Sequence, residues 1–237
     1  MSISQCRVSE KSLELNVCEN IVRILRRLIG NRVYIYGFTM KSEGLHGLDV
    51  SIRLPLRTRI TGLQFKRPYR CYRSVYVFYL NNNKKKDQHL KILCVATSLR
   101  ILGLPPAIFY AMPAFCYPHD LERASPQFLH RTVFVDPLEI PFTGRHRYEV
   151  RVDMRSLIAV FRGSREKKIK VYSSEEFIEK LREGEWGIAV KDLLRVRNVP
   201  PKDVLRYLKY EMGAPPDAIE YLTEKRLRQF FRTIAIG

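Results

Sequence analysis

Three side chains suited to binding a metal ion and a phosphate fall in two neighbouring segments of the chain. Asp49 stands in the segment GLDVSI, and Gln64 and Lys66 stand in the segment GLQFKRP. Residues 64 and 66 are two apart, so on a β-strand they share a face while Phe65 points the other way. The stretch LPLRTR between the two segments supplies a loop for a hairpin-like return. Such a return would bring Asp49 beside Gln64 and Lys66.

These residues offer the donor atoms that a hard divalent cation prefers. Asp49 offers carboxylate oxygens, Gln64 an amide oxygen and Phe65 its backbone carbonyl oxygen. Mg²⁺ in proteins takes one or two carboxylates and keeps several waters. Lys66 would lie beside a metal-bound water, favour its deprotonated form and neutralise charge on a phosphate. We therefore predict a site for Mg²⁺ or Mn²⁺ in which water is activated for attack on phosphorus.

The elements that would position these residues alternate between helix and strand. Apolar residues at helical spacing predict a helix over residues 11–29, which Gly30 and Asn31 end. Alternating or continuous apolar runs predict further elements: strands over 32–39, 48–54, 60–66 and 75–80, a helix over 88–102, and strands over 107–115, 132–136 and 148–160. A helix on each side of a mixed sheet is the simplest arrangement that buries these apolar faces.

The last part of the chain is predicted to be mainly helical. Ser173 or Ser174 caps a helix over 175–183, and three more helices are expected over 188–197, 201–212 and 216–233. We place a domain boundary at residue 147, which divides the chain into an α/β core domain, 1–147, and a strand-plus-helical domain, 148–237. The second domain is open to two roles, DNA binding through a helix-turn-helix or formation of a homodimer.

The charge of the chain points to a polyanionic partner. Its 237 residues include 42 Lys and Arg against 24 Asp and Glu, a net charge of +18. Such an excess is most simply explained by nucleic acid. Six arginines crowd the predicted hairpin and third strand, with Tyr69 and Tyr72 between them: Arg53, Arg57, Arg59, Arg67, Arg70 and Arg73. We predict that they contact phosphates; the alternative is an Arg-rich surface of a heat-adapted protein.

Other patterns argue against several classes of protein. Charged residues and prolines interrupt the most apolar stretch, so no membrane span is expected, and the polar start lacks a secretory signal. The five cysteines are odd in number and irregularly spaced, so we expect mostly reduced thiols in a cytoplasmic, intracellular protein. Cys116 and His119 form one C-x-x-H pair without a second pair, which argues against structural zinc. P-loop, Rossmann and G-x-S-x-G motifs are missing from the sequence.

On these residues and this order of elements, the chain resembles the PD-(D/E)XK nuclease superfamily, with its restriction-endonuclease-like core. The signature of that superfamily is an Asp on the second strand, then an acidic residue, any residue and a Lys on the third. Asp49 and Lys66 match the outer positions, and Gln64 occupies the acidic position, as in several branches that carry Gln there. Leu48 stands where the superfamily has Pro. The resemblance covers roughly residues 11–116.

The resemblance implies a fold, an activity and a further site residue. The expected fold is a mixed central sheet flanked by helices, with a mainly helical C-terminal appendage. The expected activity is Mg²⁺- or Mn²⁺-dependent hydrolysis of DNA, favoured over RNA; the alternative is an inactive nucleic-acid-binding protein that keeps the fold. Many members carry a Glu on the first helix, where Glu19 fits and Glu14 competes with it. That helix resembles the opening helix of archaeal Holliday-junction resolvases, and the Arg-rich, Gln-poor composition suggests an archaeal or archaeal-viral, thermophilic source.

Overall fold

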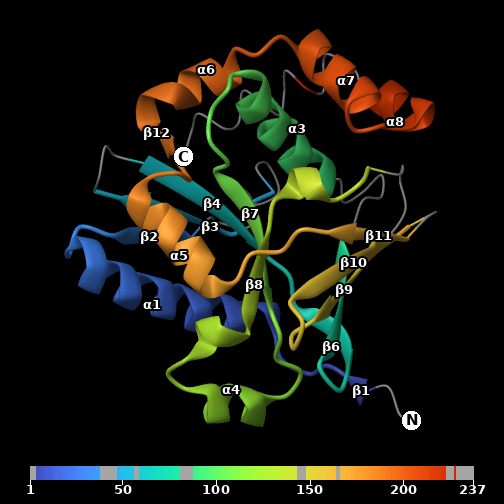
Figure 1. The fold of residues 1–237 in the computed structure, drawn as a ribbon. Coiled ribbons are helices and arrows are strands. Elements are labelled where there is room, and N and C mark those ends of the chain that lie inside the picture. The colour runs from blue at the N-terminus through green and yellow to red at the C-terminus, as the bar shows by residue number, and fades with distance from the viewer. Residues whose placement is uncertain are drawn as a thin grey trace.

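The computed structural model describes residues 4–37, 47–55, 59–80, 88–142, 148–163, 166–222 and Leu227. The fold is mixed α/β with two sheets, seen side by side in Figure 1. The first sheet has the strand order β2-β3-β4-β7-β8, with β12 paired to β4, and the second has the order β1-β5-β6-β9-β10-β11. Among the described helices, none combines the length and the apolar composition needed to cross a bilayer.

The first sheet begins as an antiparallel meander and continues through a parallel pair. Its strands are β2 (Tyr34–Gly37), β3 (Val50–Leu54), β4 (Arg59–Phe65), β7 (Ile108–Pro113) and β8 (Thr132–Val135). β2, β3 and β4 pair antiparallel in sequence order, whereas β4 and β7 are parallel. A parallel pair needs a long crossover, and helix α3 (Gln88–Ile101) lies within this one.

Helices cover the two faces of this sheet. Helix α1 (Glu10–Ile29) begins after Ser9, whose side chain accepts a hydrogen bond from the backbone N–H of Ser12 at 3.0 Å. Its buried side chains share one core cluster with Val50 and Ile52 of β3, while α3 belongs to the clusters on the other side. Figure 1 accordingly shows α1 and α3 on opposite sides of the sheet. Because strand side chains alternate, residues 49, 51 and 53 face α3.

The second sheet is built from both sides of residue 147. Its strands are β1 (Ser4–Gln5), β5 (Pro68–Tyr72), β6 (Val75–Leu80), β9 (Tyr148–Asp153), β10 (Ile158–Arg162) and β11 (Glu166–Ile169). Strand β9 pairs antiparallel with β6, with Leu80 opposite Tyr148. The 148–160 region predicted as strand is therefore a hairpin of two strands, and it joins a sheet begun by the preceding part of the chain.

The C-terminal part lies against the first sheet and α3. Its elements are α5 (Ser174–Glu183), β12 (Ile188–Ala189), α6 (Leu193–Arg197), α7 (Pro201–Tyr210) and α8 (Pro216–Tyr221). The helix predicted over 188–197 is wrong in its first part, because Ile188 and Ala189 pair with β4 and the helix starts only at Leu193. Most of the segment predicted as helix beyond residue 222 lies outside the described residues.

The cysteines include one pair that the sequence did not predict. Cys6 and Cys116 are joined in a disulfide, with their Cα atoms 4.2 Å apart, although 110 residues separate them in the chain. The odd count and irregular spacing gave no indication of this pair, although three of the five cysteines remain thiols, as expected. The reason is tertiary: β1 pairs with β5, and the backbone N–H of Arg7 donates to the carbonyl oxygen of Cys116 at 2.7 Å. Cys18, Cys71 and Cys94 remain as thiols. The small α4 (Pro118–Ala124) follows Cys116.

Candidate functional site

The structure brings Asp49, Gln64 and Lys66 together between the first sheet and α3. Gln64 donates from Nε2 to Asp49 Oδ2 at 2.6 Å, and the backbone N–H of Phe65 donates to the same oxygen at 2.5 Å. Asp49, Gln64 and Lys66 are only 4%, 1% and 8% exposed. The antiparallel register makes this possible, because Val50 lies opposite Leu63 and so places the preceding Asp49 beside the following Gln64. The hairpin-like return predicted from the sequence is thus present.

A fourth residue, Gln88, extends this group into a hydrogen-bonded chain. Lys66 Nζ donates to Gln88 Oε1 at 2.7 Å, and Gln88 Nε2 donates to Gln64 Oε1 at 2.6 Å. Gln88 is the first residue of α3. Sequence reasoning missed it, because nothing in the sequence spacing shows that the start of this helix approaches the ends of β3 and β4. The only available signal was its position in a short polar stretch at the start of a predominantly apolar helix.

The position of the Gln64 amide bears directly on metal binding. Its Nε2 lies 2.6 Å from Asp49 Oδ2 and 3.1 Å from the carbonyl oxygen of Phe65. Asp49 Oδ2 and the carbonyl oxygen of Phe65, two of the predicted oxygen ligands, therefore point to the same position. The Nε2 amide group of Gln64 occupies that position and donates to both oxygens. The nitrogen and oxygen of an amide can exchange places by a rotation of the side-chain amide. With Oε1 turned inwards, Asp49, Gln64 and Phe65 would present three oxygens, a donor set that suits Mg²⁺ or Mn²⁺.

The two acidic candidates on α1 occupy different environments. The Glu19 side chain is 60% exposed and pairs with Arg23 at 3.8 Å. Glu14 is only 6% exposed and pairs with Lys11 at 2.5 Å. Burial raises the pKa of the nearby Cys18 thiol to about 12, and the negative charges of Glu14 and Asp49 contribute to this shift. Glu14 is thus buried on α1, whereas Glu19, the residue predicted to support the metal, faces outward and pairs with Arg23.

The six arginines divide between surface and structural positions. Arg53 is exposed and lies over the ring of Tyr36, 5.4 Å from its centroid. Arg59 instead donates to the backbone carbonyl oxygens of Gly184 and Gly187, so it holds the C-terminal part against β4. The other three described arginines surround β5 in the second sheet: Arg67 and Arg73, both exposed, and Arg70, which pairs with Glu149 at 3.4 Å. Arg57 lies outside the described residues.

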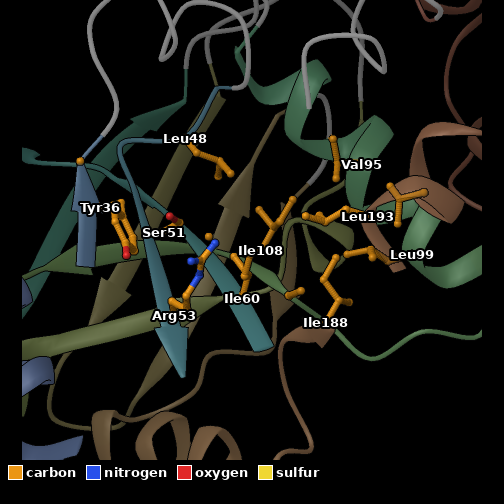
Figure 2. A pocket seen from close by; sticks show the side chains of 14 residues that line it. Tyr36, Leu48, Ser51, Arg53, Ile60, Val95, Leu99, Ile108, Ile188 and Leu193 are labelled. Atoms are coloured by element: carbon orange, nitrogen blue, oxygen red, sulfur yellow. The ribbon is translucent and has the colours of Figure 1, made fainter. Parts of the chain in front are cut away.

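A cavity of about 360 Å³ lies between the first sheet, α3 and α6 (Figure 2). Its walls are mainly apolar side chains from the first sheet, α3 and α6, with polar groups at Tyr36, Ser51 and Arg53. Ser51 and Gly62 line it, and each lies two residues from Asp49 or Gln64 on the same face of its strand, a step of about 6.6 Å. A largely apolar cavity with a few polar groups is typical of a ligand site.

One buried titratable group borders the network. His89 Nδ1 and the Tyr110 hydroxyl are 2.8 Å apart, and His89 Nε2 has no hydrogen-bond partner among the described residues. Burial, together with the positive charge of Lys66, lowers the pKa of His89 to about 3. This imidazole is therefore neutral at physiological pH. In the same region, burial raises the pKa of the Tyr110 hydroxyl, and the charge of Asp49 raises it further.

Comparisons of this chain with protein-family models, curated proteins and solved structures find no match. What the protein does is therefore inferred from its own residues and their arrangement.

Proposed function

We propose that the protein is a Mg²⁺- or Mn²⁺-dependent nuclease that hydrolyses DNA phosphodiester bonds at Asp49, Gln64 and Lys66. The observation that carries the proposal is the direct contact between Asp49 and Gln64 on neighbouring antiparallel strands, at 2.6 Å, with Lys66 two residues further on. Buried polar groups that converge from separate strands near a cavity are typical of an active site.

The order of elements supports a restriction-endonuclease-like core. Helix α1 precedes the meander β2-β3-β4, and α3 then leads into β7, which is parallel to β4. The order of elements is therefore one helix, three strands, a second helix and a fourth strand, with one helix on each face of the sheet. The strands β5 and β6 are inserted between β4 and α3 and belong to the second sheet. The proposed core therefore spans residues 10–113, with an insertion.

The chain's own residues have distinct roles in this proposal. Asp49, Gln64 and the carbonyl oxygen of Phe65 would hold the ion, which supplies Lewis-acid activation and charge neutralisation when bound. Lys66 places a positive charge where a phosphate would develop negative charge during attack. Gln88 is a positioning residue, because its amide joins Lys66 to Gln64 and so fixes the separation of the two side chains. Compared with an acidic residue at this position, the neutral amide of Gln64 leaves the ligand set with one negative charge fewer, which should weaken binding of the cation.

The charge distribution supports a nucleic acid as the substrate. The chain carries a net charge of +18, and Arg53, Arg67 and Arg73 are exposed. Each phosphate neutralised by such groups releases counterions, so affinity should fall steeply with salt, with a log–log slope of about −0.9 per phosphate contacted on duplex DNA. Such contacts carry no sequence information.

One observation favours a second candidate, a nucleic-acid-binding protein without catalysis. The side chains of Asp49, Gln64, Gln88 and Lys66 bond to one another in a continuous chain, with a donor in the place where the ion would sit. A buried polar network whose members bond to one another also stabilises a fold without binding any ligand.

Cleavage assays with matched variants separate the two candidates. Labelled linear, nicked and four-way-junction DNA is incubated with Mg²⁺ or Mn²⁺ and the wild type, Asp49→Ala, Lys66→Ala or Lys168→Ala. Lys168 is exposed on β11, so its variant controls for the loss of one charge. A nuclease loses cleavage by about 100-fold or more in the first two variants, as expected when charge stabilisation of the transition state is removed, while DNA binding persists. Binding without cleavage by the wild type in either metal would overturn the nuclease proposal.

The variant Gln64→Glu tests the ligand set independently of activity. In the absence of metal it places two carboxylates in contact in a buried site, so the folded protein should lose roughly 1–3 kcal/mol of stability. A divalent cation should restore it, which makes the melting temperature of the variant more dependent on Mg²⁺ or Mn²⁺ than that of the wild type. Equal metal dependence of the two proteins would argue against an ion at this position.

A further inference from the structure

Three cysteines from distant parts of the chain lie close together. Cys6 follows β1, Cys71 lies in β5 and Cys116 follows β7. Their three sulfur atoms all lie within 4.8 Å of one another. Cys6 and Cys116 are buried, and Cys71 is half-buried. Because the Cys6–Cys116 disulfide uses only two of the three sulfurs, the third sulfur in contact range calls for an explanation.

The three sulfurs lie close enough together to reach a single tetrahedral ion once the disulfide is reduced. Zinc binds thiolate sulfur at about 2.3 Å, so tetrahedral geometry places two such sulfurs about 3.8 Å apart. In the oxidised protein all three sulfurs lie within 4.8 Å of one another, and the sulfurs of Cys6 and Cys116 are bonded. Reduction of that bond would let the two sulfurs separate to the distance that zinc requires. A water would complete four-coordination, and the half-buried Cys71 leaves that side open to solvent.

The backbone holds the three cysteines together without the covalent bond. The N–H of Cys6 donates to the carbonyl oxygen of Tyr69 at 3.0 Å, and the N–H of Arg7 donates to the carbonyl oxygen of Cys116 at 2.7 Å. Gln5 and Ser4 pair with Arg70 and Cys71 in the β1–β5 ladder. Reduction of the disulfide would therefore leave three thiols already gathered in one place.

An acidic side chain lies beside the cluster. Asp120 accepts a hydrogen bond from the backbone N–H of Cys116 at 3.2 Å. A carboxylate at this position favours a cation bound to the neighbouring sulfurs.

We propose that Cys6, Cys71 and Cys116 form a zinc site in the reduced protein, which the Cys6–Cys116 disulfide closes in the oxidised protein. A dithiol reductant transfers two electrons and two protons to the disulfide, and its own two thiols become a disulfide. The three cysteines then lose their protons as their thiolates bind Zn²⁺. In the reverse direction, a disulfide oxidant takes two electrons from Cys6 and Cys116, joins their sulfurs and expels the ion.

Zinc content and affinity test the proposal, and neither depends on nuclease activity. The full chain is reduced with a phosphine, loaded with Zn²⁺, freed of excess metal and assayed by mass spectrometry and by competition with a chromogenic chelator. We expect about one zinc per reduced chain, released on oxidation with diamide. Losing even an outer-shell partner costs about 10–100-fold in affinity, so Cys71→Ser should bind zinc at least about 100-fold more weakly.

Two further variants control the interpretation. Cys94→Ser alters a buried cysteine of α3 and should bind zinc like the wild type. Asp49→Ala removes the carboxylate of the proposed nuclease site and should also leave zinc binding unchanged, so the two proposals can fail separately. Cys71→Ser keeps both partners of the disulfide, so its fold can be checked under oxidising conditions. Reduced wild type without stoichiometric zinc, or Cys71→Ser with wild-type affinity, would overturn the proposal.

Discussion

At the residue scale, the orientation of one amide separates two uses of the same cluster. With Nε2 towards Asp49, the Gln64 side chain links Asp49 to Gln88 and the site is a closed polar network. With Oε1 towards Asp49, the same atoms become ligands for a cation. Lys66 must then lose or reorient its bond to Gln88, since Gln88 would have to accept from Gln64 instead. Metal binding and the position of the lysine are therefore coupled through Gln88.

His89 gives the folded protein a predictable pH dependence. The pKa of this buried imidazole is lowered from 6.5 to about 3, so the unfolded chain binds a proton that the folded chain does not. Stability from the neutral imidazole is fully present above pH 6.5 and is lost as the pH falls towards 3. Between these values, the free energy of unfolding should fall by about 1.4 kcal/mol per pH unit on account of His89.

Urea unfolding of the wild type and His89→Gln between pH 4.5 and pH 7 checks this slope. Glutamine keeps a polar partner for the Tyr110 hydroxyl but does not titrate. The difference in unfolding free energy between the two proteins should change with the predicted slope, because the contributions of the carboxylates are common to both. A difference that stays constant with pH would show that His89 does not carry this dependence.

At the scale of elements, the C-terminal part is anchored to β4 through one tight turn. Gly187 has a φ of 86°, and its N–H donates to the carbonyl oxygen of Pro106 at 2.8 Å. A Cβ atom at this position would lie 2.8 Å from Thr61 Oγ1 and 3.2 Å from the carbonyl oxygen of Ile60. The turn therefore requires glycine for two reasons, a left-handed backbone and a close approach to β4, and β12 depends on it.

Replacing this glycine should loosen the C-terminal part. Gly187→Ala is expected to destabilise the protein by roughly 1–3 kcal/mol, the usual cost of a non-glycine residue in a disfavoured backbone conformation. The matched control is Gly37→Ala at the end of β2, where an added Cβ meets no atom within 4 Å and should change stability by less than about 0.5 kcal/mol. Equal midpoints for the two variants in chemical denaturation would contradict this role of the turn.

At the scale of the whole molecule, the two sheets share cores that cross residue 147. Strand β9 pairs with β6, and Tyr148, Val150 and Phe161 are buried in the same cluster as Ile108 and residues of α3. Burial of side chains of this size contributes roughly 1.5–3 kcal/mol each, and a domain has only about 5–15 kcal/mol of net stability. The two halves of the chain are therefore energetically dependent on each other.

A fragment of residues 1–147 should accordingly fail to fold. Removing β9 and β10 leaves β6 as an exposed edge and removes Tyr148, Val150 and Phe161 from the shared core, which favours aggregation. Circular dichroism and a urea titration, with the full chain as the reference, measure this directly. A cooperative urea transition of the fragment with a midpoint near that of the full chain would show that residues 1–147 form an independent domain.

Local patterns in the sequence were sufficient for most elements that position the candidate site. The helix predicted over 11–29 is found as Glu10–Ile29, and the strand predicted over 75–80 is found as Val75–Leu80. The mixed α/β class is confirmed. These features depend on apolar periodicity, helix caps and turn residues, and each of these signals lies within a few residues along the chain. The proximity of Asp49, Gln64 and Lys66 also followed locally, because a hairpin pairs segments that are close in sequence.

Contacts between segments far apart in the chain were decided only by the tertiary structure. Gln88 reaches Lys66 and Gln64 through the crossover between β4 and β7, and Cys6 meets Cys116 across 110 residues. Residues 188 and 189 have helical neighbours in sequence, yet they become a strand because β4 offers unpaired backbone groups there. Such contacts arise where packing energy outweighs local preference. A burial pattern shows which face of an element is covered but does not identify the segment that covers it.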